Sequence, residues 1–172
     1  MSKQIPKRVL IVIFVITTIL LLGWRLWPRS LYDIFRIEEG SISSLSVSVT
    51  EYGVKNGDAF MNQYLLSALS SDSNDFSAIL SILENSQYRS DFRNLSPWDI
   101  DSVESGSGYI HYSAIITLCW SNTKIGGGDL LFLNDKKVAV GLDAKNGYLI
   151  FRPANRKTLE NLAAYLMEHG EL

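Results

Sequence analysis

The sequence predicts an α+β protein: an N-terminal transmembrane helix followed by a two-layer domain, in which two helices cover an antiparallel sheet. The first observation behind this prediction is an apolar run of fourteen residues, Val9 to Leu22. The second is the order of the segments after it, β-β-α-β-β-β-β-α, which suits helices gathered on one face of a sheet. The third is the shortness of most turns between the strand-like segments, which favours antiparallel pairing.

Composition and charge limit the function. The chain has 172 residues, of which 47% are hydrophobic and 20% are charged, an ordinary globular balance. Residues 1–36 carry six bases and one acid, a net charge of +5, and residues 37–172 carry ten bases and seventeen acids, −7; together they give the −2 of the whole chain. An acidic domain argues against a nucleic-acid partner. The single cysteine, Cys119, excludes an intrachain disulfide and a cysteine-cluster metal site.

Residues 9–27 form the expected transmembrane helix, after a basic tail of residues 1–8. The run is apolar on all sides, and its nineteen residues would span roughly 28 Å, close to the ~30 Å hydrocarbon core of a bilayer. Trp24 and Trp27 suit the membrane interface, where Arg25 can reach the headgroups. We therefore expect the lipid bilayer to be one partner of the chain.

A cleaved signal peptide is the competing interpretation, because basic residues precede the apolar run. The exit of the run, GWRLWP over residues 23–28, is too bulky for a small-residue cleavage site, so we favour an uncleaved signal-anchor. The positive-inside rule, by a narrow margin, leaves the N-terminus in the cytoplasm. We expect a single-pass protein of the cell membrane whose residues 41–172 lie outside.

The first half of the domain follows a linker. Residues 28–40 are expected as this juxtamembrane linker or as a short helix, and residues 38–172 are expected to fold alone. Residues 45–50 alternate strictly and predict a strand, after which Asn56-Gly57 predicts a hairpin turn. Residues 59–69 suit either a strand or a helix. A helix is expected over residues 75–85, with Phe76, Ile79, Leu80 and Leu83 on one face.

The second half is rich in predicted strands. Residues 86–107 are expected as a long irregular connection. Strands are predicted over residues 109–120, 129–133, 137–142 and 148–152, with a glycine-rich turn over residues 121–128. A final helix is expected after Asn155, with Leu159, Leu162, Ala163 and Leu166 on one face.

No catalytic, cofactor or metal site emerges from the residues. Gly126-Gly127-Gly128 precedes a predicted strand, whereas a phosphate-binding loop needs a helix there. The acids of residues 99–104 lack the glycine and spacing of a calcium loop. His111 and Cys119 are roughly 26 Å apart along one strand, too far for a catalytic pair, and we expect Cys119 to pack as a small hydrophobe. The chain is therefore not expected to be an enzyme.

The candidate ligand-binding residues lie in and before the long connection. They are Tyr88, Arg89, Phe92, Arg93 and Trp98. Aromatic rings in a polar loop are candidates for recognition, and the two arginines would bind an anion or a carboxylate. The alternative is that the rings fill the gap between helix and sheet while the arginines pair with nearby acids.

A resemblance supports the same organisation. The basic tail, the single apolar run, the Tyr88-Arg89-x-x-Phe92 exit from a helix and the Pro97-Trp98 pair resemble uncharacterised membrane-anchored and lipoprotein-type extracytoplasmic proteins of Gram-positive bacteria. The lipidated cysteine of the lipoprotein members is lacking, and no residue role carries over. We expect a membrane-anchored, non-catalytic binding or sensing domain with a protein or peptide partner. The alternatives are an accessory or structural subunit of a membrane protein complex and, third, an enzyme with an unrecognised site.

Overall fold

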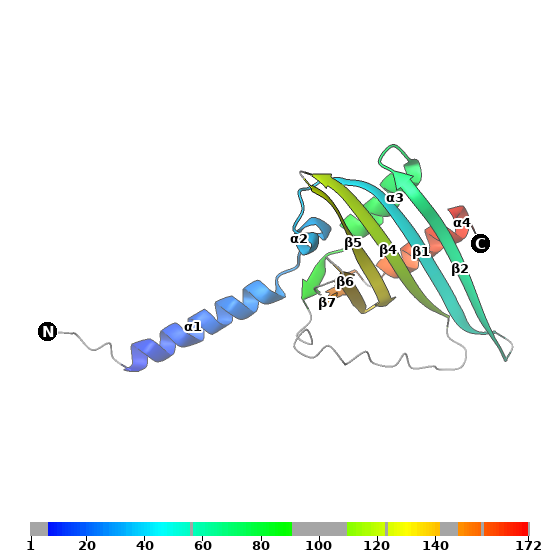
Figure 1. The fold of residues 1–172 in the computed structure, drawn as a ribbon. Coiled ribbons are helices and arrows are strands. Elements are labelled where there is room, and N and C mark those ends of the chain that lie inside the picture. The colour runs from blue at the N-terminus through cyan, green and yellow to red at the C-terminus, as the bar shows by residue number, and fades with distance from the viewer. Residues whose placement is uncertain are drawn as a thin grey trace.

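The protein is built on one seven-stranded antiparallel sheet (Figure 1). The computed structural model describes residues 7–55, 57–90, 110–122, 124–141, 148–155 and 157–171. The strands are β1 (Ile42–Lys55), β2 (Asp58–Ser70), β3 (Tyr88–Ser90), β4 (His111–Asn122), β5 (Lys124–Asn134), β6 (Lys137–Gly141) and β7 (Tyr148–Pro153). They pair in the order β2-β1-β4-β5-β6-β7-β3. The helices are α1 (Lys7–Leu26), α2 (Leu31–Phe35), α3 (Asn74–Glu84) and α4 (Thr158–His169).

The α+β class and the antiparallel sheet are confirmed, but the predicted order of elements is wrong in two places. A short helix, α2, lies within the residues expected as a linker, and its apolar side chains are buried. A short strand, β3, lies at the start of the expected irregular connection and pairs with β7. Both elements are too short to produce a periodic pattern. A short helix is the alternative expected within residues 28–40, whereas no pattern indicates β3.

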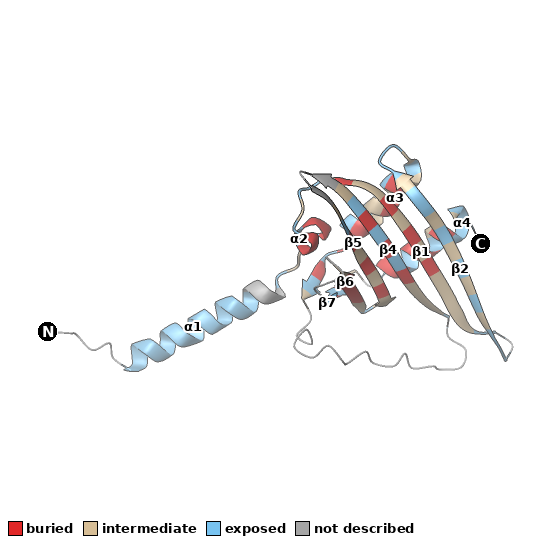
Figure 2. Cartoon of the chain, viewed as in Figure 1, coloured by how far each residue is buried: buried red, intermediate tan, exposed pale blue. Residues whose placement is uncertain are grey.

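The transmembrane helix expected over residues 9–27 is not found: within the described residues, no helix is long and apolar enough to cross a membrane. Helix α1 does cover most of this run, and it extends away from the domain (Figure 1). Every large hydrophobic side chain from Val9 to Leu22 is between 44% and 73% exposed (Figure 2). Trp27 is 71% exposed, and the side chains of Trp24 and Arg25 lie outside the described part of the chain.

The first hairpin is longer than its sequence pattern predicts. Residues 59–69, left open between strand and helix, belong to strand β2, which pairs with β1 from Lys55↔Asp58 onward. Gly57, in the turn, has a φ of 91°, a conformation that glycine adopts without strain. At the other end the register shifts, and Ala68 takes a positive φ of 54°, with its N–H donating to Ser46 Oγ at 3.0 Å. This bulge ends the regular pairing of β2.

The glycine run predicted as a turn lies inside strand β5. Gly126 pairs with Trp120 and Gly128 with Leu118, so the ladder passes through the run. A Cβ atom on Gly126 would lie 2.5 Å from Trp120 Nε1, and one on Gly128 would lie 2.5 Å from Phe35 Cε1. Two aromatic rings therefore occupy the space that side chains would fill at these positions, which requires glycine.

The core lies between the sheet and its helices. Helix α4 contacts β1, β2 and β4, and it also packs against α3. Its predicted apolar face is confirmed, because Leu159, Leu162, Ala163 and Leu166 are all buried. On α3 the buried residues are Phe76, Ile79 and Leu83, and Ser73 caps the helix by accepting from the Phe76 N–H at 3.0 Å. A hydrogen bond of 2.7 Å from Tyr165 Oη to Asp75 Oδ1 joins α4 to α3.

Candidate functional site

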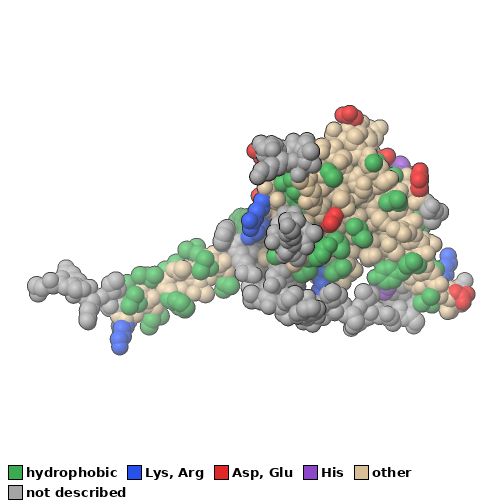
Figure 3. Space-filling model, in the orientation of Figure 1, with side chains coloured by type: hydrophobic (Ala, Val, Ile, Leu, Met, Phe, Trp, Pro, Cys, Tyr) green, Lys and Arg blue, Asp and Glu red, His purple; other side chains and the backbone are tan. Residues whose placement is uncertain are grey.

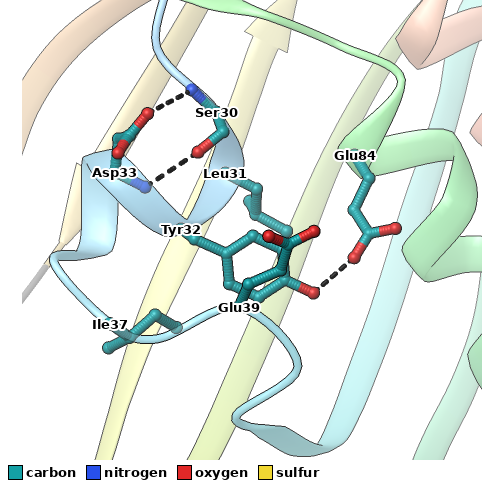
Figure 4. Close-up of a pocket in the computed structure, with 7 residues that line it drawn as sticks. All are labelled: Ser30, Leu31, Tyr32, Asp33, Ile37, Glu39 and Glu84. Carbon is teal, nitrogen blue, oxygen red and sulfur yellow. Dashed lines mark hydrogen bonds between the residues drawn. The ribbon is translucent and has the colours of Figure 1, made fainter.

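The candidate site is a cavity of about 300 Å³ between α2 and the end of α3 (Figure 4). Its wall consists of Ser30, Leu31, Tyr32, Asp33, Ile37, Glu39 and Glu84. Six of these residues come from the segment expected as a linker, and Glu84 comes from the last turn of α3. The cavity thus forms where the start of the domain meets a helix that is distant in sequence.

A capping box builds the N-terminal wall of the cavity. The Asp33 N–H donates to Ser30 Oγ at 3.1 Å, and the Ser30 N–H donates to Asp33 Oδ2 at 3.0 Å. The two hydrogen bonds from Ser30 lower the pKa of Asp33. This carboxylate therefore stays ionised, and it accepts the hydrogen bond of the capping box. Arg36, with a positive φ of 56°, then ends the helix and turns the chain back over Tyr32.

The centre of the cavity is a hydrogen bond between a phenol and a carboxylate. Tyr32, which is 8% exposed, donates its hydroxyl proton to Glu84 Oε1. Burial and this hydrogen bond raise the pKa of Tyr32 to about 12, so the side chain stays a neutral donor at physiological pH. Glu39 also lines the cavity, and its charge adds to the rise in the pKa of Tyr32 (Figure 4). The arrangement is acidic.

The polar groups of the described cavity wall are carboxylates, one phenol and the Ser30 hydroxyl. Where the structure describes it, the wall has three exposed carboxylates, Asp33, Glu39 and Glu84, one neutral phenol, and no histidine, cysteine or lysine. A phenol with a pKa near 12 does not exchange protons efficiently at neutral pH. Among the described residues, no group of three or more histidine, cysteine, aspartate or glutamate side chains is placed to hold a metal ion.

Of the predicted recognition residues, Tyr88 lies in the core. Tyr88 is 0% exposed, and its hydroxyl donates to the carbonyl oxygen of Leu83 at 3.1 Å. Burial raises the pKa of Tyr88 well above its usual range. This ring is therefore part of the core and cannot line a recognition surface, because β3 turns it inward against α3.

The other members of the set are not brought together. Arg89 is exposed on β3, opposite Arg152 of β7. Phe92, Arg93 and Trp98 lie outside the described residues, and their role in recognition stays a prediction. The acids of residues 99–104 lie outside the described residues as well.

Two residues weighed for catalysis lie on the outer face of β4. His111 stacks against Tyr52, with ring centroids 5.6 Å apart, and its Nε2 has no hydrogen-bond partner within the described structure. Cys119 is an exposed free cysteine, so the expectation that it packs as a small hydrophobe is wrong. Cys119 lies on the face of β4 opposite to the buried side chains of Ile116 and Leu118, so its thiol is exposed.

The cavity residues were missed, although one signal in the sequence points to them. Ser30 and Asp33 have the spacing of a capping box, with Leu31, Ile34 and Phe35 as apolar residues around it, which indicates a helix start. The bond between Tyr32 and Glu84 joins residues that are 52 positions apart, so no local pattern could have revealed it.

The membrane-anchored and lipoprotein-type likeness stays a prediction, as do the partner and the ligand. No protein family, curated protein or solved structure matches the chain.

Proposed function

We propose that the protein is a membrane-anchored, non-catalytic binding domain. The observation that supports this function is the bare apolar surface of α1. Its large hydrophobic side chains from Val9 to Leu22 are all exposed, and hydrophobic side chains extend along the helix in Figure 3. Removing such surface from water is favourable by about 25 cal/mol per Å². A helix that is apolar on all sides is suited to lipid rather than to one face of a domain.

The anchor we propose is the run of residues 9–27 predicted from the sequence. Lys7 and Arg8 begin α1, and Arg29 follows it, so basic side chains flank the apolar run at both ends. Basic residues next to an apolar segment are attracted to anionic headgroups. This flanking supports an anchor whose two ends lie at the two membrane interfaces, with the N-terminus in the cytoplasm and the folded domain outside.

The connection between α1 and the domain is short and is joined to β3 by two backbone hydrogen bonds, which would keep the domain close to the bilayer. The Arg29 N–H donates to the Tyr88 carbonyl at 2.9 Å, and the Tyr88 N–H donates to the Arg29 carbonyl at 2.8 Å. Helix α2 follows at once and is buried in the core. The cavity beside α2 would consequently face the membrane side of the domain, where a bound ligand and the lipid surface are close together.

Flotation of the full chain with protein-free liposomes tests the anchor. We expect the wild type to float, and we expect Ile13→Arg with Ile16→Arg to lose most of its flotation, because an arginine near a helix centre costs about 2.5–3.5 kcal/mol on insertion. Ser67→Arg with Ser77→Arg adds the same charge at exposed positions of the domain and is the matched control. Unchanged flotation of the α1 variant would overturn the proposal. No flotation of the wild type would instead favour an accessory subunit whose α1 is covered by another protein.

A reporter fusion tests the orientation. Alkaline phosphatase fused after Leu172 should be active, because it folds only outside the cytoplasm, and β-galactosidase at the same position should be inactive. The opposite pair of activities would place the domain in the cytoplasm and reverse the proposed topology.

A further inference from the structure

Strand β2 leaves most of its outer edge without a backbone partner among the described residues. It is the first strand in the sheet order, so only its inner side pairs, with β1. That pairing is regular from Lys55↔Asp58 to Val47↔Leu66. The outer side therefore offers a straight row of backbone donors and acceptors.

The contact of Leu65 shows which residues of β2 direct their backbone N–H and C=O groups to the free edge of the sheet. The Leu65 N–H donates to the Glu171 carbonyl at 2.9 Å, and the Glu171 N–H donates to the Leu65 carbonyl at 3.1 Å. Because alternate residues of an antiparallel strand direct their backbone groups to the same side, Ala59, Met61 and Gln63 also point outward. The end of the chain thus already pairs with this edge in the antiparallel sense, through one isolated bridge.

The usual protection of an edge strand is missing over residues 59–63. Natural edges are blocked by lysine, proline or a bulge, but this stretch reads AFMNQ and the bulge of β2 lies beyond Leu66. Met61 is 74% exposed on the outer face. It continues a row formed by Tyr52 and His111 across β1 and β4, so a hydrophobic side chain of an added strand would extend this row.

The summed charge of the side chains around the open edge is negative. Asp58 lies at one end, and Glu168 and Glu171 lie at the other, near the bridge to Leu65. Lys55 is opposite Asp58 in the register and offsets one of these acids. A peptide that carries lysine or arginine would therefore be attracted to the edge, whereas an acidic peptide would be repelled.

We infer that the open edge of β2, from Ala59 to Gln63, binds an extended basic peptide of a partner protein as an eighth strand of the sheet. The inference rests on the proposed function in taking the domain to be a binding module, and it names the class of partner. The added strand would run antiparallel to β2 and receive backbone hydrogen bonds at Ala59, Met61 and Gln63. This is recognition by strand addition, in which the backbone supplies affinity and alternate side chains supply specificity.

The probe for this site is a labelled, amidated heptapeptide of alternating lysine and valine, added to the full chain in nanodiscs. Its two controls are the same peptide with glutamate in place of lysine and one with proline in place of the central valine. We expect saturable binding of the basic peptide only. Hydrogen exchange should slow at the Ala59, Met61 and Gln63 amides, by about tenfold or more, and stay unchanged at Phe60 and Asn62, which already pair with β1.

Two variants at one position separate the backbone from the side chain. Met61→Pro removes an outward N–H that the fold does not use, a change that edge strands tolerate. We expect it to weaken peptide binding by about tenfold, the effect of one or two lost hydrogen bonds. Met61→Ala keeps the N–H and should weaken binding by less. A urea melt of each variant checks that the sheet is intact.

The outcomes distinguish this inference from the proposed function. Equal binding to wild type and Met61→Pro, or equal binding of the basic and acidic peptides, would overturn the inference while flotation could still support the anchor. A dimer of the chain that Met61→Pro abolishes would overturn it too, because the occupant would then be a second copy. Loss of flotation with intact peptide binding would remove only the anchor.

Discussion

Helices α1 and α2 are neighbours in sequence, both are apolar, and they have opposite surroundings. Four residues, 27–30, separate them. The large apolar side chains of α1 are all exposed from Val9 to Leu22, whereas Leu31, Ile34 and Phe35 of α2 are at most 3% exposed. An apolar composition alone therefore does not say whether a segment belongs to a membrane anchor or to a core. What differs is length and support: α2, with five residues, depends on a capping box and on the sheet beneath it.

Removing α2 should have the largest effect, because it takes away part of the core. Each of Leu31, Ile34 and Phe35 is worth about 2–5 kcal/mol by the usual cost of emptying a core position, and together they approach the whole stability of a typical domain. We expect the fragment 28–172 to melt cooperatively in urea and the fragment 38–172 to melt broadly. Similar melts, followed by circular dichroism, would show that α2 is an accessory to the fold. The expectation that residues 38–172 fold alone would then stand.

The same substitution in the two helices should separate their roles. Phe35→Ala should destabilise the domain by about 3–5 kcal/mol, because Phe35 is 3% exposed and packs over Gly128. Phe14→Ala, at a position that is 73% exposed, should change the free energy of unfolding by less than about 1 kcal/mol. Urea melts measure both values, and the liposome flotation assay should respond to Phe14→Ala alone. Equal losses of stability would show that the side chains of α1 support the folded domain as much as those of α2.

Tyr32→Phe tests how α2 is held against α3. The change removes the hydrogen bond to Glu84, which should cost about 1.5–3 kcal/mol, as for a bond to a charged group. The pKa of Tyr32 is about 12 in the folded protein, above the ordinary value of 10.0. The folded state thus binds the phenol proton more tightly, and this stability is complete below about pH 10 and is lost as the pH rises toward 12.

The pH dependence needs its own control, because the pKa values of other tyrosines, Tyr165 among them, are also raised. The hydrogen bond to Asp75 is the main cause that raises the pKa of Tyr165 to about 12. We expect the alkaline loss of stability to be smaller in Tyr32→Phe than in wild type, and smaller again when Tyr165→Phe is added. Melting temperatures between pH 8 and 12 measure this loss, because the range covers both the ordinary tyrosine pKa of 10.0 and the raised values of about 12. If all variants lost melting temperature with pH as the wild type does, neither phenol would be the cause of the alkaline loss of stability.

The smallest effect is expected at the cap of α2. Ser30→Ala removes one half of the capping box and should cost about 1 kcal/mol. Ser73→Ala removes the corresponding cap of the longer α3 and is the matched control. If α2 depends on its cap as its length suggests, Ser30→Ala should also weaken the protection of the Arg29 and Tyr88 amides from hydrogen exchange, whereas Ser73→Ala should not.

The parts of the fold that were predicted correctly are those whose cause is local. The alternation of Leu45, Val47 and Val49 and the apolar face of α4 follow directly from side-chain period, so a single sequence reveals them. Helix α2 and strand β3 depend on distant partners instead. Tyr88 pairs with Arg29 on one side and with Pro153 on the other, and neither pairing leaves a trace in the residues around it.

The position of the glycine run and the existence of the cavity were not predicted from the sequence, and the physical reason is the same for both. Gly126 and Gly128 resemble turn residues, but they are required in β5 because the rings of Trp120 and Phe35 lie over them. The cavity depends on a hydrogen bond between Tyr32 and Glu84. In each case the decisive contact joins segments that are far apart in the chain, and it could be predicted only once the sheet order was known.

If α1 is the proposed anchor, the bridge between Arg29 and Tyr88 is the point where the domain is attached to it. Any pull transmitted along α1 reaches the domain first at these two hydrogen bonds, on the short strand β3 at the margin of the sheet. Three residue pairs join β3 to β7, whereas eleven join β1 to β2. Tension would therefore peel the sheet from its weakest side, and the long β1–β2 hairpin at the opposite margin would be the last part to feel the force.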